Sequence, residues 1–378
     1  MNPKVIQADV TVVGDGVIGQ SIAFEARRVG LRVVLLGKHQ PGAATPAAGG
    51  MLCPSGEAFE SEQRLINLAT ESCRIYPDFI KRVEEISGLP TGYDKHGTLM
   101  VALTRDHVGQ LEQLGKAQQK RGLQTKWLEP NVLKELEPNI SPRQCGALLA
   151  GDDHQVNPVM LHAALVGANQ KSGCVLIEHP GVTKLSKAGE EVQGVELLDH
   201  PEYSRVESPW VVSASGAWSR EIEELKDIPL RPVRGQYVRL QGAPLLKHVV
   251  RTPDLYMIPR DEGVLYLGGS MEEAGFDPKP LAGHTMDLLW HGFRAVPGIY
   301  ELEMLETTAG FRPALRDNLP AIGHSKVPGL LTAIGHYRHG IMLAPITAVA
   351  ILELLQANRV PDLVQQLSVR RFEDENQT

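Results

Sequence analysis

Residues 8–19 read ADVTVVGDGVIG, a G-x-G-x-x-G motif that directly follows an apolar, β-branched stretch. This pattern is typical of the first β–α turn of a dinucleotide-binding fold, in which each glycine has its own role. Gly14 allows a tight turn, Gly16 lets the backbone approach a diphosphate, and Gly19 lets the helix pack close to the strand. The diphosphate would lie at a helix N-terminus, where unpaired N–H groups and the helix dipole favour negative charge.

The residues after the motif complete a β–α–β unit. Residues 20–29 carry apolar side chains at helical spacing, Gly30 ends the helix, and residues 31–36 predict a second buried strand. In such units the second strand usually ends near an acidic residue that accepts a hydrogen bond from a ribose hydroxyl. Gly37 and Lys38 stand at that place. The sequence therefore predicts that an adenosine ribose is held in some other way, and Lys38 leaves open a cofactor that carries a phosphate at that place.

The bulk composition is that of an ordinary globular chain. Its 378 residues suffice for two domains or one interleaved pair, with 42% hydrophobic residues, 22% charged residues and a formal net charge of −7. A negative charge without a basic run argues against nucleic acid or an anionic membrane as partner. Neither a signal peptide nor an uncharged membrane span is recognised, so the expected compartment is the cytoplasm. The scattered Cys53, Cys73, Cys145 and Cys174 are expected to be reduced thiols, and no metal site is expected.

Further elements follow from periodicity and from glycine and proline punctuation. Residues 41–55 form a nearly uncharged segment of small residues, suited either to close approach to a flat ligand or to an ordinary linker. A second glycine-punctuated loop is predicted at residues 335–345. Helices are predicted at 60–87, 106–120, 158–171 and 346–357, and strands at 97–103, 174–177, 255–259 and 264–268. Residues 211–219 predict a further strand that runs into a small-residue turn.

Seven segments, in this order, resemble the FAD-dependent D-amino-acid oxidase superfamily, and within it most of all the glycine oxidases of thiamine biosynthesis. They are GDGVIGQSIAFEARRVG (14–30), AAGGML (47–52), SGAWS (215–219), LYMIPR (255–260), LGGSME (267–272), AGFRPALRDNLPAIG (309–323) and AIGHYRHGIMLAP (333–345). The resemblance implies an α/β chain in which a Rossmann-type FAD-binding domain (residues 1–90, 150–225 and 306–378) is interleaved with a smaller α+β substrate-binding domain built on an antiparallel sheet (residues 91–149 and 226–305).

The resemblance also implies which residues bind cofactor and substrate. In the superfamily, the positions that Arg312 and Arg338 match lie on the carboxylate side of the substrate. Arginine suits such a position because its guanidinium meets a carboxylate with two parallel hydrogen bonds. Tyr256 would hydrogen-bond or cover the substrate, and Met271 would border its alkyl side. Noncovalently bound FAD would contact Gly14, Gly16, Val17, Ile18, Gly19, Gly37, Lys38, Ala44, Thr45, Gly49, Gly50, Met51, Val182, His336, Tyr337, Arg338, His339, Gly340, Ile341 and Met342.

The activity implied by the resemblance is oxidative deamination of glycine, sarcosine or small D-amino acids. A hydride passes to flavin N5, the imine hydrolyses to an oxo acid such as glyoxylate, and O2 reoxidises the flavin to give H2O2. No residue stands out as a required catalytic base, so positioning would carry most of the catalysis. Two alternatives stay open: a D-amino-acid or secondary-amine dehydrogenase of the same fold that passes electrons to a quinone or partner protein, and a flavin-carrying subunit without amine oxidation. A homo-oligomer is compatible with the resemblance.

Overall fold

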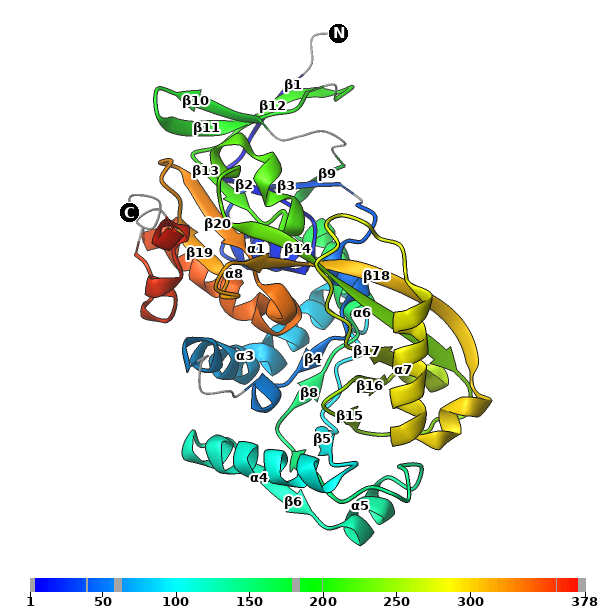
Figure 1. The fold of residues 1–378 in the computed structure, drawn as a ribbon. Helices are drawn as coiled ribbons and strands as arrows, with labels where there is room; N and C mark the ends of the chain where they lie inside the picture. The colour runs from blue at the N-terminus through cyan, green and yellow to red at the C-terminus, as the bar shows by residue number, and fades with distance from the viewer. Residues whose placement is uncertain are drawn as a thin grey trace.

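The computed structural model describes residues 4–38, 40–57, 63–178, 184–198, 200–357 and 359–372, which are built around two large sheets (Figure 1). The first has six strands in the order β19-β20-β13-β2-β3-β9, parallel except for β19. The predicted β–α–β unit is confirmed as β2, α1 (Val17–Arg28) and β3. The six strands are β2 (Val10–Val13), β3 (Val33–Gly37), β9 (Val175–Glu178), β13 (Trp210–Ser213), β19 (Ala321–His324) and β20 (Leu330–Ile334).

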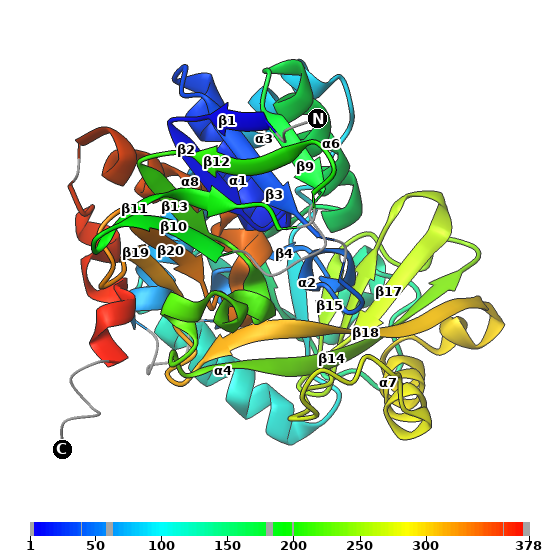
Figure 2. The ribbon, with the colours of Figure 1, turned by 90° about the horizontal axis from the view of Figure 1, so that it is seen from above.

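Both faces of this sheet are covered, as is usual for buried parallel strands. One face packs against a layer of helices, α1, α3 (Gln63–Ser87), α6 (Pro158–Lys171) and α8 (Gly340–Ala357). The other face lies beneath a four-stranded sheet in the order β1-β12-β11-β10, which Figure 2 shows from above. Its strands are β1 (Lys4–Gln7), β10 (Lys184–Ala188), β11 (Glu191–Glu196) and β12 (Tyr203–Glu207).

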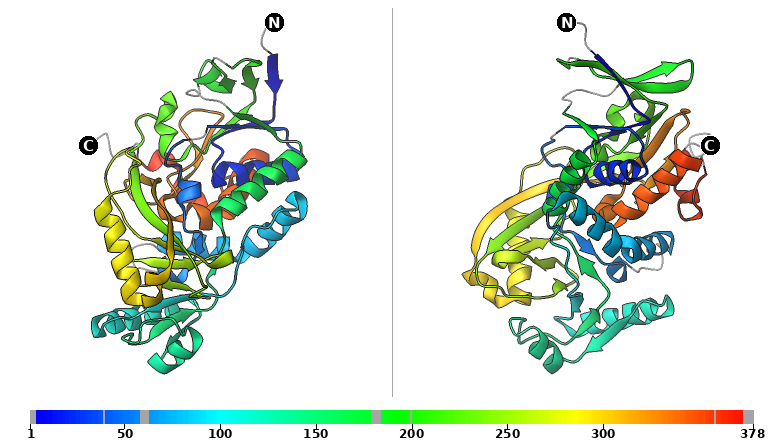
Figure 3. Two further views of the ribbon diagram at one scale, coloured as in Figure 1. Left: turned by 90° about the vertical axis from the view of Figure 1, so that its right-hand side faces the viewer. Right: turned by 180° about the vertical axis from the view of Figure 1, so that it is seen from behind.

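The second large sheet has eight strands in the order β18-β14-β17-β16-β15-β5-β7-β6. It is antiparallel as predicted, except that β15 and β5 run parallel. α7 (Ala282–Ala295) packs on it, while α4 (Arg105–Lys120) and α5 (Pro130–Leu136) lie at the end of the molecule away from the four-stranded sheet (Figure 3). The eight strands are β5 (Thr98–Val101), β6 (Thr125–Leu128), β7 (Ala147–Ala150), β14 (Leu230–Gln241), β15 (Val249–Arg251), β16 (Tyr256–Pro259), β17 (Val264–Gly268) and β18 (Glu303–Leu315).

Short elements connect the two large sheets. α2 (Ala44–Ala47) and the small β4–β8 ladder (Met51–Leu52 with His154–Gln155) lie in or beside the predicted small-residue segment. The remaining pieces are 3₁₀ helices: η1 (Ser55–Glu57), η3 (Gly216–Glu221), η4 (Glu223–Leu225), η5 (Asp261–Gly263), η6 (Pro297–Glu301), η7 (Tyr337–His339), η8 (Asp362–Leu367) and η9 (Val369–Phe372). The division of the chain into two domains stays a prediction, and its proposed boundary at residue 306 falls inside β18.

The predicted loop at residues 335–345 is wrong in its second half, because α8 already begins at Gly340 and runs through Pro345. A proline inside a helix has no N–H to give to the carbonyl four residues earlier, which here belongs to Ile341. Two side chains of α3 supply donors instead. Tyr76 Oη donates to Ile341 O at 3.1 Å, and Ser72 Oγ donates to the next carbonyl, Met342 O, at 2.6 Å. Packing against α3 therefore lets the helix start before the proline.

Replacing Tyr76 with phenylalanine is expected to lower the free energy of unfolding by about 1–3 kcal/mol, because it leaves the buried carbonyl of Ile341 without its donor. Denaturant unfolding of the purified variant measures this loss. Tyr300→Phe is the matched control: its side chain is 80% exposed, so its hydroxyl is expected to contribute little. Equal stability of Tyr76→Phe and wild type would contradict this account of how α8 passes Pro345.

One described helical stretch, Tyr337–Ala357, is long and apolar enough to cross a membrane by length and composition. The sequence predicts no such uncharged span, and Arg338 and Glu353 are charged residues within this one. In the fold, 61% of its apolar window is buried, and α8 packs on α1 and α3. Its apolar composition is thus explained by its place in the core.

All four cysteines lie in the described part of the chain and form no disulfide. Burial raises the pKa of Cys174 to about 12, and it also raises the pKa of Cys73 and of Cys53 above the ordinary thiol value. Cys53 Sγ lies 3.1 Å from Thr98 Oγ1. These three sulfurs are therefore thiols rather than thiolates at neutral pH.

Candidate active site

A cavity of about 580 Å³ opens between the two large sheets. Its walls include the carboxyl ends of β2, β3 and β20 and the segment that follows β13, together with parts of β14, β16 and β18. Ligands of open α/β sheets bind at the carboxyl ends of the strands, and the volume lies in the usual range for a ligand pocket. The cavity therefore joins the predicted dinucleotide turn to the second sheet.

The three motif glycines play separate structural roles. Gly14 has φ +117, and a Cβ there would overlap the carbonyl oxygen of Ala214. A Cβ on Gly19 would overlap the carbonyl oxygen of Gly14, so Gly19 is needed for close helix–strand packing, as predicted. Gly16 differs: a Cβ there would meet Thr45 Oγ1 at 3.3 Å and would otherwise face the cavity. The surface at Gly16 is thus a cradle that a side chain would fill, which fits a bound diphosphate.

The N-terminus of α1 faces this cradle. Val17 and Ile18, its first two residues, line the cavity, and the N-cap residue Gly16 has no side chain to cover them. Thr45 Oγ1 accepts a hydrogen bond from Val17 N at 3.0 Å and ties α2 to the turn. A helix N-terminus that opens into a cavity attracts negative charge.

Residues 43–51 form a wall of the cavity and are anchored from the second sheet. Arg260, which is largely buried, donates to the carbonyl of Gly49 and to Gln155 Oε1, the latter at 2.9 Å. Burial lowers the pKa of Arg260 to about 10, so it stays charged at neutral pH. Gly50 has φ +75, and a Cβ there would overlap the carbonyl oxygen of Val156. The backbone of this wall is therefore held in one place.

The stretch from His336 to Met342 forms another wall. His336 is buried, and its Nε2 lies 3.0 Å from Thr347 Oγ1. Burial lowers the pKa of His336 to about 3, so its imidazole is neutral at physiological pH. His339 N donates to His336 O at 2.9 Å, and α8 then begins at Gly340. The cavity thus meets a second helix N-terminus at α8.

Arg312 reaches the cavity from β18, opposite β14. Its guanidinium lies directly on the backbone of Gly235, where a Cβ would overlap both Nη1 and Cζ. Arg312 Nη1 donates to the carbonyl of Ser270 at 2.8 Å. A bare glycine below and a carbonyl at one side therefore set the orientation of this guanidinium.

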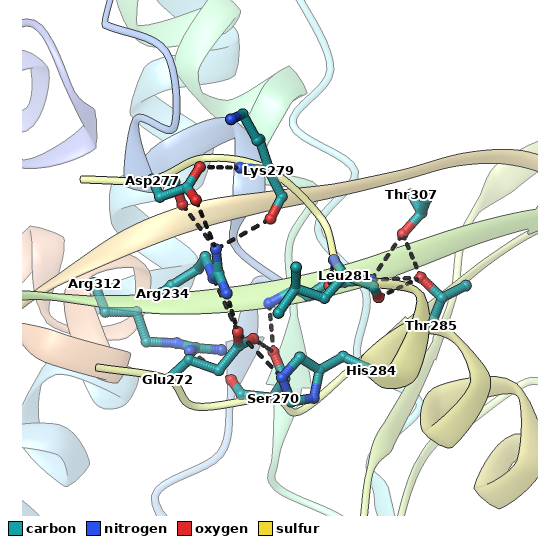
Figure 4. Close-up of polar contacts among 11 residues, drawn as sticks. Arg234, Ser270, Glu272, Asp277, Lys279, Leu281, His284, Thr285, Thr307 and Arg312 are labelled. Atoms are coloured by element: carbon teal, nitrogen blue, oxygen red, sulfur yellow. Dashed lines mark hydrogen bonds and ion pairs between the residues drawn. The ribbon is translucent and has the colours of Figure 1, made fainter. Parts of the chain in front are cut away.

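A buried ion pair holds the segment that carries Ser270 (Figure 4). Arg234 is only 4% exposed, and its Nε donates to Glu272 Oε2 at 2.9 Å, while the backbones of the two residues exchange two hydrogen bonds of 2.9 Å. Ser270 Oγ donates to Glu272 Oε1 at 3.0 Å, and His284 Nε2 lies 3.1 Å from Oε2. The partner of Arg312 is thus fastened to β14.

Tyr256 lies over a second glycine. A Cβ on Gly268, in the neighbouring strand β17, would come within 2.6 Å of Tyr256 Cζ and 2.7 Å of its Oη. The ring stacks on Tyr266 with centroids 6.1 Å apart, and Tyr266 stacks on Tyr237 at 4.7 Å. Tyr266 Oη also donates to Ala47 O at 2.7 Å. This stack connects the sheet floor of the cavity to α2.

Arg338 and Met271 are much more exposed than Arg312. Arg338 is exposed to solvent and lies over the ring of Tyr337, 5.5 Å from its centroid, and Met271 is 57% exposed. Tyr337 Oη lies 3.2 Å from Met271 Sδ, and Tyr337 has a left-handed φ of +50. Both residues line the cavity near solvent.

The structure brings nearly all of the predicted site residues to this one cavity. Gly19 packs beneath it instead of lining it, and Val182 lies outside the described residues. Which of them bind FAD or substrate stays a prediction. Those that line the cavity are Gly14, Gly16, Val17, Ile18, Gly37, Lys38, Ala44, Thr45, Gly49, Gly50, Met51, Tyr256, Met271, Arg312, His336, Tyr337, Arg338, His339, Gly340, Ile341 and Met342.

Other residues of the site were missed by the sequence reasoning. Arg260 and Trp218 lie in the quoted segments LYMIPR and SGAWS, which was the available signal for them. Trp218 lines the cavity, and its ring centroid lies 6.1 Å from that of Phe311. Gly235 and His162 carry no local signal, because their roles depend on strands and helices that are distant in sequence.

Comparison with known proteins agrees with this geometry. The sequence pattern of the family described as DAO, FAD dependent oxidoreductase, matches residues 9–354. The chain is 31% identical over 355 residues to the glycine oxidase of Geobacillus kaustophilus (strain HTA426), covering 92% of this chain and 93% of that protein. The solved structure of a glycine oxidase from Geobacillus kaustophilus superposes with a TM-score of 0.89 at 28% identity, covering 97% of this chain and 99% of the other.

A further relative is longer than this chain. The Bifunctional protein ThiO/ThiG of Trichormus variabilis (strain ATCC 29413 / PCC 7937) is 31% identical over 376 residues, which is 98% of this chain but 56% of that protein. This chain therefore spans about half the length of such relatives. On the family match, its coverage and the shared fold, this chain belongs to the family of FAD-dependent oxidoreductases.

Proposed function

We propose that this enzyme oxidises glycine, sarcosine or another small amino acid at Cα and passes the electrons to O2. A hydride leaves Cα, water adds to the resulting imine, and an oxo acid such as glyoxylate is released with ammonia or an amine. Bound FAD supplies the hydride acceptor, and its reoxidation by O2 gives H2O2. Likeness to glycine oxidases over nearly the whole chain supports this proposal. The likeness to ThiO/ThiG supports the further proposal that the reaction serves thiamine biosynthesis.

The observation that carries the proposal is the guanidinium of Arg312 on the backbone of Gly235. A guanidinium has five N–H donors, and the carbonyl of Ser270 takes one of them. Its planar fork suits a carboxylate, and it faces the same cavity as the glycine motif. A substrate carboxylate bound there by two parallel hydrogen bonds would be held in one orientation.

Other groups of the cavity wall support the same chemistry. Tyr256 places a phenol on the sheet floor, and Arg338 adds positive charge on the solvent side. The N-terminus of α8 presents a partial positive charge at Gly340. A flavin ring bound beside it would have the negative charge of its reduced form stabilised there. The substrate amine reacts as the neutral species, so no protein base is needed. Binding and orientation are the main contributions of the chain.

The deciding experiment is an absorption spectrum of the purified protein before and after anaerobic addition of glycine. We expect an oxidised flavin spectrum that glycine or sarcosine bleaches and that air restores with production of H2O2. Acetate, which has a carboxylate but no amine, is the matched control and should shift the spectrum without bleaching it. Bleaching without peroxide on admission of air would favour the dehydrogenase. Bound flavin that none of these amines bleaches would contradict the proposal.

A further inference from the structure

The end of β3 lacks the group that such a fold uses to hold an adenosine ribose. In β–α–β dinucleotide sites, a carboxylate near the end of the second strand accepts a hydrogen bond from a ribose hydroxyl. This chain has Gly37 at the end of β3, followed by the exposed Lys38, and both line the cavity. The strand itself therefore supplies no carboxylate there.

The space above Gly37 is nevertheless taken by a carboxylate. A Cβ built on Gly37 would lie 2.6 Å from Asp15 Cβ, 2.7 Å from its Cγ and 2.6 Å from its Oδ2. The side chain of Asp15 thus crosses the end of β3 at the point where a side chain at position 37 would begin. Asp15 and a larger residue at position 37 exclude each other in this geometry.

The turn is held in a way that keeps Asp15 at this place. Gly14 N donates to Leu36 O at 2.8 Å, which joins the ends of β2 and β3. His162 Nε2 lies 2.6 Å from the carbonyl oxygen of Asp15, so it can donate from α6. Asp15, His162 and Gly37 all line the cavity. The carboxylate is therefore part of the cavity wall beside the diphosphate cradle.

We propose that Asp15, from the middle of the glycine motif, accepts hydrogen bonds from the hydroxyls of the FAD adenosine ribose in place of a residue at the end of β3. The two positions are complementary: the absence of a side chain at residue 37 makes room for the carboxylate at residue 15. This inference rests on the binding of FAD at the motif and is independent of the substrate proposed above.

A first test needs no substitution. Apoprotein is titrated with FAD and with the FAD analogue that carries 2′-deoxyadenosine, and quenching of flavin fluorescence reports both dissociation constants. Hydrogen bonds to a charged group contribute about 1.5–3 kcal/mol, so we expect FAD to bind about 10- to 100-fold more tightly than the analogue. Equal affinities would overturn the proposal. No substrate turnover enters this measurement, so its result is separate from that of the glycine experiment.

The second test moves the carboxylate. Asp15→Asn keeps an acceptor oxygen but loses the charge, so it is expected to weaken FAD binding about 10-fold and to reduce the preference over the deoxy analogue. Asp287→Asn, an exposed aspartate on α7, is the control and should bind FAD as wild type does. Gly37→Glu alone should also bind weakly, because Asp15 is in its way.

The double variant Asp15→Gly/Gly37→Glu removes every side-chain atom of residue 15, including the Cβ that a Cβ at residue 37 would overlap. It should recover most of the affinity and the preference for FAD over the deoxy analogue. Gly37 does not have a positive φ, so its backbone accepts glutamate. Thermal unfolding of each apoprotein shows whether the variants are folded. Wild-type affinity in folded Asp15→Asn, or an unchanged preference for FAD over the deoxy analogue, would overturn the assignment.

Discussion

Replacing Gly16 with valine is expected to give folded but colourless protein whose affinity for FAD falls at least about 100-fold. Gly16 has φ −67 and ψ 176, which any residue adopts, so backbone geometry does not require glycine here. A valine side chain would instead occupy the cavity at the N-terminus of α1. Losing one or two hydrogen bonds to a charged diphosphate, at about 1.5–3 kcal/mol each, gives an effect of this size.

Two other glycines make the result interpretable. Gly283→Val is the control, because Gly283 is exposed on α7 and a Cβ there has nothing within 4 Å; this variant should stay yellow. Gly19→Val should fail to fold, since its Cβ would overlap the carbonyl of Gly14. Flavin content is read from the ratio of visible to ultraviolet absorbance, and folding from circular dichroism. A Gly16→Val protein with wild-type flavin content would contradict the proposal that the FAD diphosphate lies against Gly16.

Arg312→Ala is expected to raise the KM for glycine and sarcosine about 100-fold while flavin content stays at the wild-type level. The loss corresponds to about 3 kcal/mol, the size expected when a carboxylate loses two charge-assisted hydrogen bonds. Steady-state kinetics with peroxide detection measures KM, and the visible spectrum measures flavin. An unchanged KM would remove Arg312 from the substrate site.

Gly235→Ala tests the same guanidinium without altering it. The added Cβ would overlap Nη1 and Cζ of Arg312, so the side chain must move and KM should rise nearly as much. Adding Gly235→Ala to Arg312→Ala should then have little further effect, because the group it displaces is already gone. Gly283→Ala is the control on an open surface. Fully additive effects would show that Gly235 acts by some route other than Arg312.

The parts of the fold set by local pattern could be predicted from the sequence. The β2–α1–β3 unit has apolar residues at strand and helix spacing on either side of its glycines, and α6 and β17 match their predicted ranges. Most of the site residues proposed from the seven segments also line one cavity, while their roles in binding FAD and substrate stay predictions. The backbone around the cavity could be predicted from local sequence because glycines and strand ends determine its path.

What could not be predicted depends on partners far along the chain. Pro345 suggests a break, yet Tyr76, 269 positions earlier, donates to the carbonyl that the proline leaves without a partner. The support beneath Arg312 comes from Gly235 on another strand, and the long strands β14 and β18 were not recognised. The role proposed for Asp15 required knowing that its side chain crosses Gly37. Each of these depends on a contact that only the tertiary structure brings about.

Three cysteine thiols, those of Cys53, Cys73 and Cys174, are protected against the peroxide that the proposed reaction would form. Peroxide attacks the deprotonated form of cysteine, and Cys53 borders the very cavity in which peroxide would arise. Burial raises the pKa of Cys53, Cys73 and Cys174, so their thiolate forms are scarce at neutral pH. Repeated turnover in air should therefore leave these three side chains unoxidised, because burial keeps their thiols protonated.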